Sequence, residues 1–347
     1  MNQFHNPIFL LRVLKSYIFD INRVWKTDLE SLKKYQNKSF RKIVNYAYTV
    51  PLYHKKYKQA GIHPNDIKGI NDIKKLPFIT KNDLRSNFPD GIIPREFDKK
   101  NGFLLSTSGS TGKPVFVYCD KFSAVKRLEG FVRTLRAYGG NWRKSKTVLI
   151  IDLSPGSVEY ATFQASALPF LKKIISLDNI KYIDISEKPE IVAKKINEFK
   201  PEFLSSDPDL LRKLASLKIN GFNLDIKPKY IFSGGSMLDQ YTRKYIEDAF
   251  ETKILDIYGS TEAGPMAFEC LEGGYYHVHS DFVFLEFLDN ENNSVDFGKS
   301  GKSVVTKLYG QDTPIIRYTG IEDTIKPIEK ETNCGIITKM IKQIEGR

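Results

Sequence analysis

Between residues 147 and 258 the sequence alternates short apolar runs with longer amphipathic stretches, and this alternation limits the fold more than any other feature. The short runs predict buried strands, and the stretches between them carry apolar residues at helical spacing. Such alternation is typical of βαβ units in a largely parallel sheet. The predicted strands are 147–152, 181–185, 202–205, 230–233 and 254–258, and the predicted helices are 160–172, 189–200, 209–218 and 238–250.

The flanking segments have other patterns. Apolar spacing predicts helices in the first 95 residues, over 29–48 and 53–61, and an amphipathic helix over 7–18 that packs on the body and is too short to span a bilayer. Strand-like runs at 103–105 and 115–118 precede a helix at 120–138, and beyond Gly264 only strands are predicted, at 277–288, 303–308, 315–318 and 324–328. We therefore predict an α/β fold with a helical region (1–100), an α/β core (101–265) and a small β subdomain (266–347).

Charge and cysteine content exclude several classes of protein. The 53 Lys and Arg residues against 41 Asp and Glu give a net charge of +12, but the lysines are spread along the chain without a basic tail or a nucleic-acid-binding motif. We therefore expect no nucleic-acid partner, and a basic surface suits a small anionic substrate. Three widely spaced cysteines and the lack of a cleavable leader predict a reducing, cytoplasmic compartment.

A loop at 106–114 contains five hydroxyl side chains, two glycines and Lys113 between two predicted strands. Glycine allows close approach, hydroxyl and backbone N–H groups donate to phosphate oxygens, and lysine supplies charge. The loop is not a Walker A motif, because Pro114 follows Lys113 and Thr107 stands where the first glycine is required. Taken alone, it is equally explained as a polar surface hairpin.

A second polar segment, 256–264, leaves the predicted strand at 254–258, and Ser233, Gly234, Gly235 and Ser236 leave the strand before it. Ligands of open α/β sheets bind at the carboxyl ends of the strands. Tyr258 can stack on a flat base, Thr261 can donate to a phosphate, and Glu262 can hold Mg²⁺. Glycine and serine gather at ordinary turns too, but two such turns together with the 106–114 loop indicate a nucleotide site.

The third segment, 314–323, carries Arg317, Glu322 and Asp323. A carboxylate after a turn can accept hydrogen bonds from ribose hydroxyls, as acidic residues do in dinucleotide sites. Arg317 is alternatively a structural ion-pair partner.

In this order and at this separation, the three segments resemble the adenylate-forming superfamily, and most closely its branch of phenylacetate–CoA ligases, coenzyme F390 synthetases and CapK-like proteins. The segments 51–54 (Pro-Leu-Tyr-His) and 76–85 (Leu-Pro-Phe-Ile-Thr-Lys-Asn-Asp-Leu-Arg) match the leader pattern of that branch. The resemblance implies a large N-terminal adenylate-forming domain. It also implies that MgATP and a carboxylic acid give acyl-AMP, from which a thiol, normally coenzyme A, takes the acyl group.

The resemblance also implies roles for individual residues. Thr261, Glu262 and Lys113 act on the reacting phosphates, with Thr261 at the α-phosphate and Glu262 on Mg²⁺. The other residues expected to hold the nucleotide are Ser108, Ser110 and Thr111 at the β- and γ-phosphates, Ser233, Gly234, Gly235, Asp256, Ile257 and Tyr258 around adenine, Asp323 at the ribose, and Gly109, Gly112, Gly259, Ser260 and Arg347 without a separate role.

Two features depart from the family pattern. The ribose motif of the branch is Arg-Tyr-x-x-Gly-Asp; Glu322 has the spacing of its acidic residue, and we favour Asp323, one position later. Residues 341–347 resemble the start of the family's hinge, so we expect a mobile C-terminal domain of about 100 residues, with the catalytic lysine, to be missing. We favour an engineered N-terminal piece over a naturally truncated relative and expect weak adenylation by this chain alone.

Cys270, His277 and Cys334 form a partial metal-binding pattern. The branch often has Cys-x-Cys-Gly before its hinge, and here only Cys334 of that pair remains. With Cys270 and His277 it gives three of the ligands that a structural Zn²⁺ needs; ordinary buried thiols and a strand histidine are the simpler interpretation.

Other partners and functions stay open. An amine or a carrier-protein thiol is an alternative acceptor to coenzyme A, and a non-catalytic nucleotide-binding relative is an alternative function. A homodimer is a further hypothesis, and the identity of the acid is not readable from the sequence.

Overall fold

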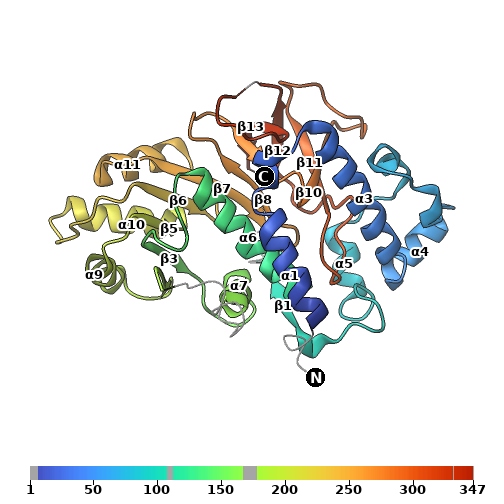
Figure 1. The fold of residues 1–347 in the computed structure, drawn as a ribbon, viewed down its shortest axis with the longest axis horizontal. Coiled ribbons are helices and arrows are strands. Elements are labelled where there is room, and N and C mark those ends of the chain that lie inside the picture. Colours follow the sequence, from blue (N-terminus) through green and yellow to red (C-terminus); the bar gives the residue numbers. More distant parts are fainter. Residues whose placement is uncertain (1–6, 108–111, 167–177, 331, 347) are drawn as a thin grey trace.

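The structure is a computed structural model that describes residues 7–107, 112–166, 178–330 and 332–346. Its N-terminal segment is helical where amphipathic spacing predicts helices (Figure 1). Local capping sets two of the starts: the Asp28 carboxylate accepts the Ser31 amide at 2.7 Å, and Thr80 and Asp83 form a reciprocal capping box. The helices are α1 (Pro7–Phe19), α2 (Arg23–Lys26), α3 (Leu29–Ala47), α4 (Pro51–Gln59) and α5 (Lys81–Asn87).

The middle of the chain alternates strands and helices in the predicted order, which confirms the α/β fold. The elements are β1 (Gly102–Ser106), β2 (Phe116–Asp120), α6 (Lys121–Ala137), β3 (Thr147–Ile151), α7 (Val158–Ser166), β4 (Ile180–Asp184), α9 (Pro189–Phe199), β5 (Phe203–Ser206), α10 (Pro208–Ile219), β6 (Tyr230–Gly234), α11 (Gln240–Phe250) and β7 (Ile254–Ser260). Strands β3 to β7 pair in parallel, in the order β4-β3-β5-β6-β7. The end of the predicted helix 160–172 lies outside the described residues.

Helices cover both faces of this parallel region, because neighbouring strand residues point to opposite sides. Leu204, Ile231 and Ile254 pack in a cluster with residues of α9, α10 and α11. The adjacent residues Phe203, Phe232 and Leu255 pack in a second cluster with residues of α1 and α6. Burial on both faces explains why these strands read as continuous apolar runs and not as alternating ones.

The C-terminal strands extend the same sheet with antiparallel pairs. They are β8 (Gly264–Glu269), β9 (Tyr276–Val278), β10 (Val283–Leu288), β11 (Gly301–Lys307), β12 (Thr324–Ile328) and β13 (Met340–Glu345). Within the described part of the chain this gives an 11-stranded sheet of order β10-β11-β12-β13-β9-β8-β7-β6-β5-β3-β4. The boundaries proposed at residues 100 and 265 stay predictions.

Two strand predictions in this region were wrong, and two strands were missed. The single strand predicted over 277–288 is two strands, because the chain turns at His279 and Ser280. Residues 315–318 form no strand, and only Tyr318 among them forms isolated bridges; Arg317 has a φ of 46° that breaks a regular ladder. Strands β8 and β13 were not predicted at all.

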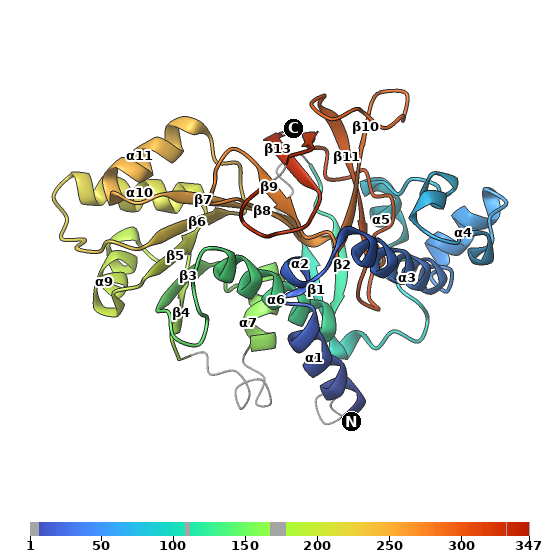
Figure 2. The same ribbon diagram turned by 45° about the horizontal axis from the view of Figure 1, so that its top comes forward.

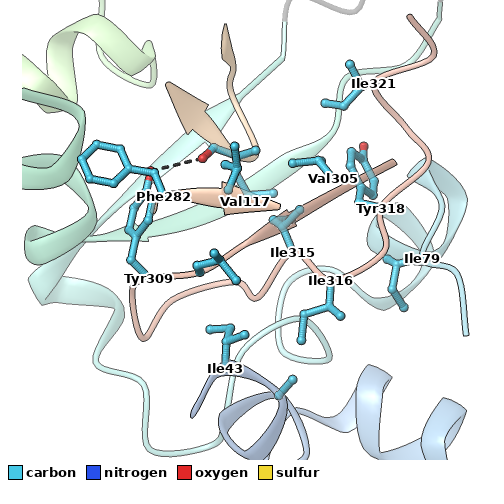
Figure 3. Close-up of a cluster of buried hydrophobic side chains, with 14 of the residues drawn as sticks. Ile43, Ile79, Val117, Phe282, Val305, Tyr309, Ile315, Ile316, Tyr318 and Ile321 are labelled. Atoms are coloured by element: carbon cyan, nitrogen blue, oxygen red, sulfur yellow. Dashed lines mark hydrogen bonds between the residues drawn. The ribbon is translucent and has the colours of Figure 1, made fainter. Parts of the chain in front are cut away.

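A large apolar core joins the N-terminal helices to the C-terminal strands. Ile43 of α3, Ile79, Val117 of β2, Val305 of β11 and Ile315 all belong to it (Figure 3). Figure 2 shows α3 and α5 beside β10 and β11. The N-terminal leader and the turn that follows residue 318 are therefore held together by one core.

Candidate functional site

A cavity of about 810 Å³ opens at the carboxyl ends of β3, β5, β6 and β7. It is also lined by Ser106 at the end of β1, by Lys113, and by residues of the 320–323 turn. The three polar segments, which are far apart in the sequence, therefore meet at one edge of the sheet, where α/β folds bind ligands.

The two ends of the candidate phosphate loop, residues 106–114, are held together by hydrogen bonds. The Thr107 amide donates to the Val115 carbonyl at 3.0 Å, and the Val115 amide donates to the Thr107 hydroxyl at 3.0 Å. The Arg85 guanidinium of α5 donates to the carbonyls of Lys113 and Pro114, and Lys113 lines the cavity. Ser108, Gly109, Ser110 and Thr111 lie outside the described residues, as does Arg347.

The turn after β7 is fixed by a close backbone approach and by an arginine. A Cβ on Gly259 would lie 2.8 Å from the Gly264 carbonyl oxygen, so only glycine fits there. The buried Arg127 of α6 donates to the carbonyl of Ser260 at 3.4 Å and to that of Thr261 at 2.6 Å. Sequence reasoning missed Arg127, because it is one of several charged residues of α6 and no local pattern distinguishes it from the others.

Glu262 follows this turn and faces the cavity although it is only 5% exposed. The Tyr318 hydroxyl donates to one of its carboxylate oxygens at 2.8 Å. Burial, followed by the charge of Glu262, raises the pKa of Tyr318, so the phenol is a proton donor at neutral pH. The other oxygen of Glu262 accepts no hydrogen bond from a described residue. A carboxylate with one fixed and one available oxygen suits Mg²⁺, a hard cation that binds oxygen ligands.

The two acidic candidates in the 320–323 turn have different surroundings. Asp323 lines the cavity and accepts a 2.8 Å hydrogen bond from the hydroxyl of Tyr258. Glu322 instead forms an ion pair with Lys81 at 2.6 Å. Asp323, one position after the spacing of the family motif and favoured from the sequence, therefore lies beside Tyr258, the aromatic residue expected at adenine.

Arg317 forms a buried ion pair with Glu286 at 3.0 Å and lies outside the cavity lining. Its backbone carbonyl accepts the Ile79 amide at 3.1 Å, and the Thr319 amide donates to the Ile79 carbonyl at 2.9 Å. The contacts of Arg317 are therefore those of a structural ion-pair partner. The 320–323 turn is positioned by the backbone hydrogen bonds of Ile79 in the leader segment.

Most of the residues expected around adenine line the cavity: Gly234, Gly235, Ile257 and Tyr258. Gly259 and Ser260, also expected to bind the nucleotide, line it too. Ser233 and Asp256 are not among the residues that line it; Ser233 is fully buried, and Asp256 accepts a 2.8 Å hydrogen bond from Tyr276 of β9. Burial raises the pKa of Asp256 to about 6 despite the Tyr276 hydrogen bond.

The part of the cavity next to α6 and α7 is lined by both polar and apolar side chains. It includes Phe131, Thr134, Ile151, Asp152, Ser157, Glu159, Ile185 and Ser205. No other described residue donates a hydrogen bond to the Glu159 carboxylate. Burial raises the pKa of Glu159, partly opposed by the nearby Arg127, which links this carboxylate to the Thr261 turn.

Cys270, His277 and Cys334 come together away from the cavity. Their ligand atoms all lie within 4.8 Å of one another, and the Cys334 sulfur is 3.3 Å from His277 Nε2. Burial lowers the pKa of His277 to about 4, so its imidazole is neutral at pH 7, the form that binds metals. Two thiols and one imidazole fit Zn²⁺ in kind, and a fourth ligand is required from outside these three residues.

The chain is similar to curated ligases over most of its length, although no family model matches it. A phenylacetate–coenzyme A ligase of Pseudomonas putida is 28% identical over 302 residues, which cover 84% of this chain and 65% of that protein. The protein CapK of Staphylococcus aureus is 27% identical over 370 residues, covering 99% of this chain and 76% of that protein. The chain thus spans just under two thirds of the length of the Pseudomonas ligase.

Among solved structures, an open conformation of 2-hydroxyisobutyryl-CoA ligase in complex with 2-HIB-AMP and CoA superposes with a TM-score of 0.78. The alignment covers 94% of this chain and 77% of that one at 18% identity. At this identity the likeness establishes the fold alone.

Proposed function

We propose, from the premise that the chain belongs to the adenylate-forming superfamily in its phenylacetate–CoA ligase-like branch, that it activates a carboxylic acid with ATP to give acyl-AMP. The observation that carries the proposal is the convergence of the three motifs on one cavity. Tyr258 is joined there to Asp323 and Tyr318 to Glu262. In this proposal Asp323 would accept hydrogen bonds from the ribose beside the ring of Tyr258, and Glu262 would bind the metal ion beside the Thr261 turn.

The chain's own residues would act by positioning and by charge. Lys113 lines the cavity at the end of the hydroxyl-rich loop and would hold the outer phosphates, and Thr261 would donate to the α-phosphate. Glu262 would hold Mg²⁺, which neutralises charge on the phosphates when bound. Arg127 fixes the carbonyls of Ser260 and Thr261, so the turn presents its side chains in one arrangement.

We propose coenzyme A as the normal acceptor of the acyl group, because the Pseudomonas relative is by name a coenzyme A ligase. An amine or a carrier-protein thiol stays an alternative acceptor. We also propose that this chain alone has weak activity. A cytoplasmic location is a further proposal, which the use of ATP as co-substrate supports.

A structural Zn²⁺ at Cys270, His277 and Cys334 is a second part of the proposal. Cys270 directly follows β8, His277 lies in β9 and Cys334 lies in the loop before β13, so a bound ion would tie that loop to the sheet. Such a tie would act on stability and not on the adenylation chemistry.

The experiment is ATP–pyrophosphate exchange by the full chain with a panel of aryl, alkyl and hydroxy acids. We expect acid-dependent exchange for at least one class, and a decrease of about a hundredfold in Glu262→Gln. The exposed Glu198→Gln on α9 is the matched control and should leave exchange unchanged.

Calorimetric titration separates the alternatives. Tight AMP binding that no acid improves, with no exchange for any acid, would favour the non-catalytic nucleotide-binding relative and overturn the proposed reaction. Thiol dependence of product formation then distinguishes coenzyme A from amine acceptors.

A further inference from the structure

Helix α1 has an outer surface that is either apolar or basic at every exposed position. The exposed residues are Pro7, Ile8, Leu11, Arg12, Leu14, Lys15, Ile18 and Phe19. Exposure reaches 77% for Ile8 and 66% for Leu11. A solvated helix face normally carries polar residues of both signs, so this face is built for a non-aqueous surface.

The inner face of α1 shows that this orientation is fixed by specific contacts. The Ser16 hydroxyl is 2.9 Å from a carboxylate oxygen of Asp20 and 2.9 Å from one of Glu129 on α6. Lys126 forms ion pairs with both carboxylates, and its side chain is 2% exposed. Rotating α1 to bury its apolar outer face would break this buried network, which is strongly destabilising.

The charge of the exposed face of α1 distinguishes between two possible partners, a second copy of the chain and an anionic lipid surface. Arg12 and Lys15 are the only charged residues of the helix, and Arg143 donates to the hydroxyl of Tyr17 near its C-terminal end. The guanidinium of Arg12 lies 3.7 Å over the ring of Phe122, with Asp120 and Asp312 nearby, so Lys15 and Arg143 supply the positive charge of this face. A second copy of the chain would oppose basic faces of two molecules that each carry +12. Anionic headgroups attract the same charges, and acyl chains accept the apolar residues.

We propose that α1 docks this protein in the plane of an anionic phospholipid surface, with Ile8, Leu11 and Ile18 in the headgroup–acyl boundary. The 13-residue helix is about 20 Å long and too short to cross a bilayer. Of the helices in the described ranges, none is long and apolar enough to be a membrane span. Docking is therefore interfacial and reversible, and it leaves the ion network between α1 and α6 intact.

Co-sedimentation of the full chain with vesicles tests this proposal. We expect binding to phosphatidylcholine vesicles that contain roughly one third phosphatidylglycerol, release at high salt, and little binding to phosphatidylcholine alone. Leu11→Ser with Ile18→Ser should reduce binding at least about tenfold. Ile219→Ser with Phe297→Ser removes two comparably exposed apolar residues outside α1 and should have no effect.

Thermal unfolding would check that both double variants fold. No binding of the wild-type chain to the anionic vesicles, or equal losses in the two double variants, overturns the proposal. Light scattering supplies a third outcome: a dimer that Leu11→Ser with Ile18→Ser dissociates would assign the face to self-association and overturn lipid docking. None of these readouts depends on the proposed adenylation.

Discussion

The hydroxyl of Tyr318 lies 2.8 Å from a carboxylate oxygen of Glu262, and this hydrogen bond joins the segment after β11 to the turn after β7. A Cβ on Gly320 would lie 2.2 Å from the hydroxyl of Tyr318, so glycine is required for the tyrosine to take this position. The contact fixes the rotamer of the proposed Mg²⁺ ligand before nucleotide binds.

Tyr318→Phe should therefore raise the apparent KM for MgATP about tenfold with a smaller change in kcat, because one hydrogen bond to a charged group is lost. Initial rates of pyrophosphate exchange over a range of Mg²⁺ concentrations measure this effect. Tyr46→Phe, which removes a 2.8 Å hydrogen bond to the Asp312 carbonyl, is the matched control. Equal KM changes in the two variants would contradict a positioning role for Tyr318.

Glu159→Gln should change the preference for acids. The carboxylate lines the cavity and accepts no hydrogen bond from another described residue, so an amino or hydroxyl substituent on the acid can donate to it. We expect acids with such a substituent to lose about tenfold in exchange rate and unsubstituted acids to be little changed. Equal effects on both groups of acids would show that Glu159 takes no part in selecting the acid.

Asp256→Asn should remove a pH-dependent contribution to stability. The folded-state pKa of Asp256 is raised from 3.8 to about 6, so folding favours its protonated form. The associated stability is fully present below the unfolded pKa and is lost as pH rises through about 6. Wild type should lose about 3 kcal/mol of unfolding free energy relative to the variant over this range, by 1.36 kcal/mol per pKa unit.

Urea unfolding at several pH values across this range measures that difference. The side-chain amide that replaces the carboxylate keeps an oxygen that can accept the Tyr276 hydroxyl, so the variant should fold. Parallel pH profiles for the two proteins would show that Asp256 has no raised pKa in the folded state.

Purified protein should contain about one zinc per chain if the three-residue cluster binds metal. Chelation should then lower the melting temperature by several degrees, roughly as expected for the loss of 1–2 kcal/mol. Cys334→Ser should lose the metal, whereas Cys119→Ser, which removes a buried thiol outside the cluster, should keep it. Absence of zinc in protein purified without chelators would dismiss the site.

Part of the candidate site could not be predicted because the positions of its residues depend on distant segments. Arg127, Tyr318 and the leader at Ile79 belong to none of the proposed nucleotide contacts, yet they fix the Thr261 turn, Glu262 and the backbone of the 317–319 segment. Their contacts join residues that lie far apart in the sequence, and no local pattern specifies such pairs.

The sequence by itself determined the α/β alternation, the motifs and their order. Local periodicity and turn chemistry encode these features, because strand burial and glycine conformations act over a few residues. Only the tertiary structure decided that Asp323 faces Tyr258 while Glu322 pairs with Lys81, and that Asp256 points to Tyr276 and away from the cavity. In a strand a shift of one residue reverses the direction of a side chain, and in a turn neighbouring side chains also point to different surroundings. The packing of leader, helices and sheet decides which residue faces the cavity.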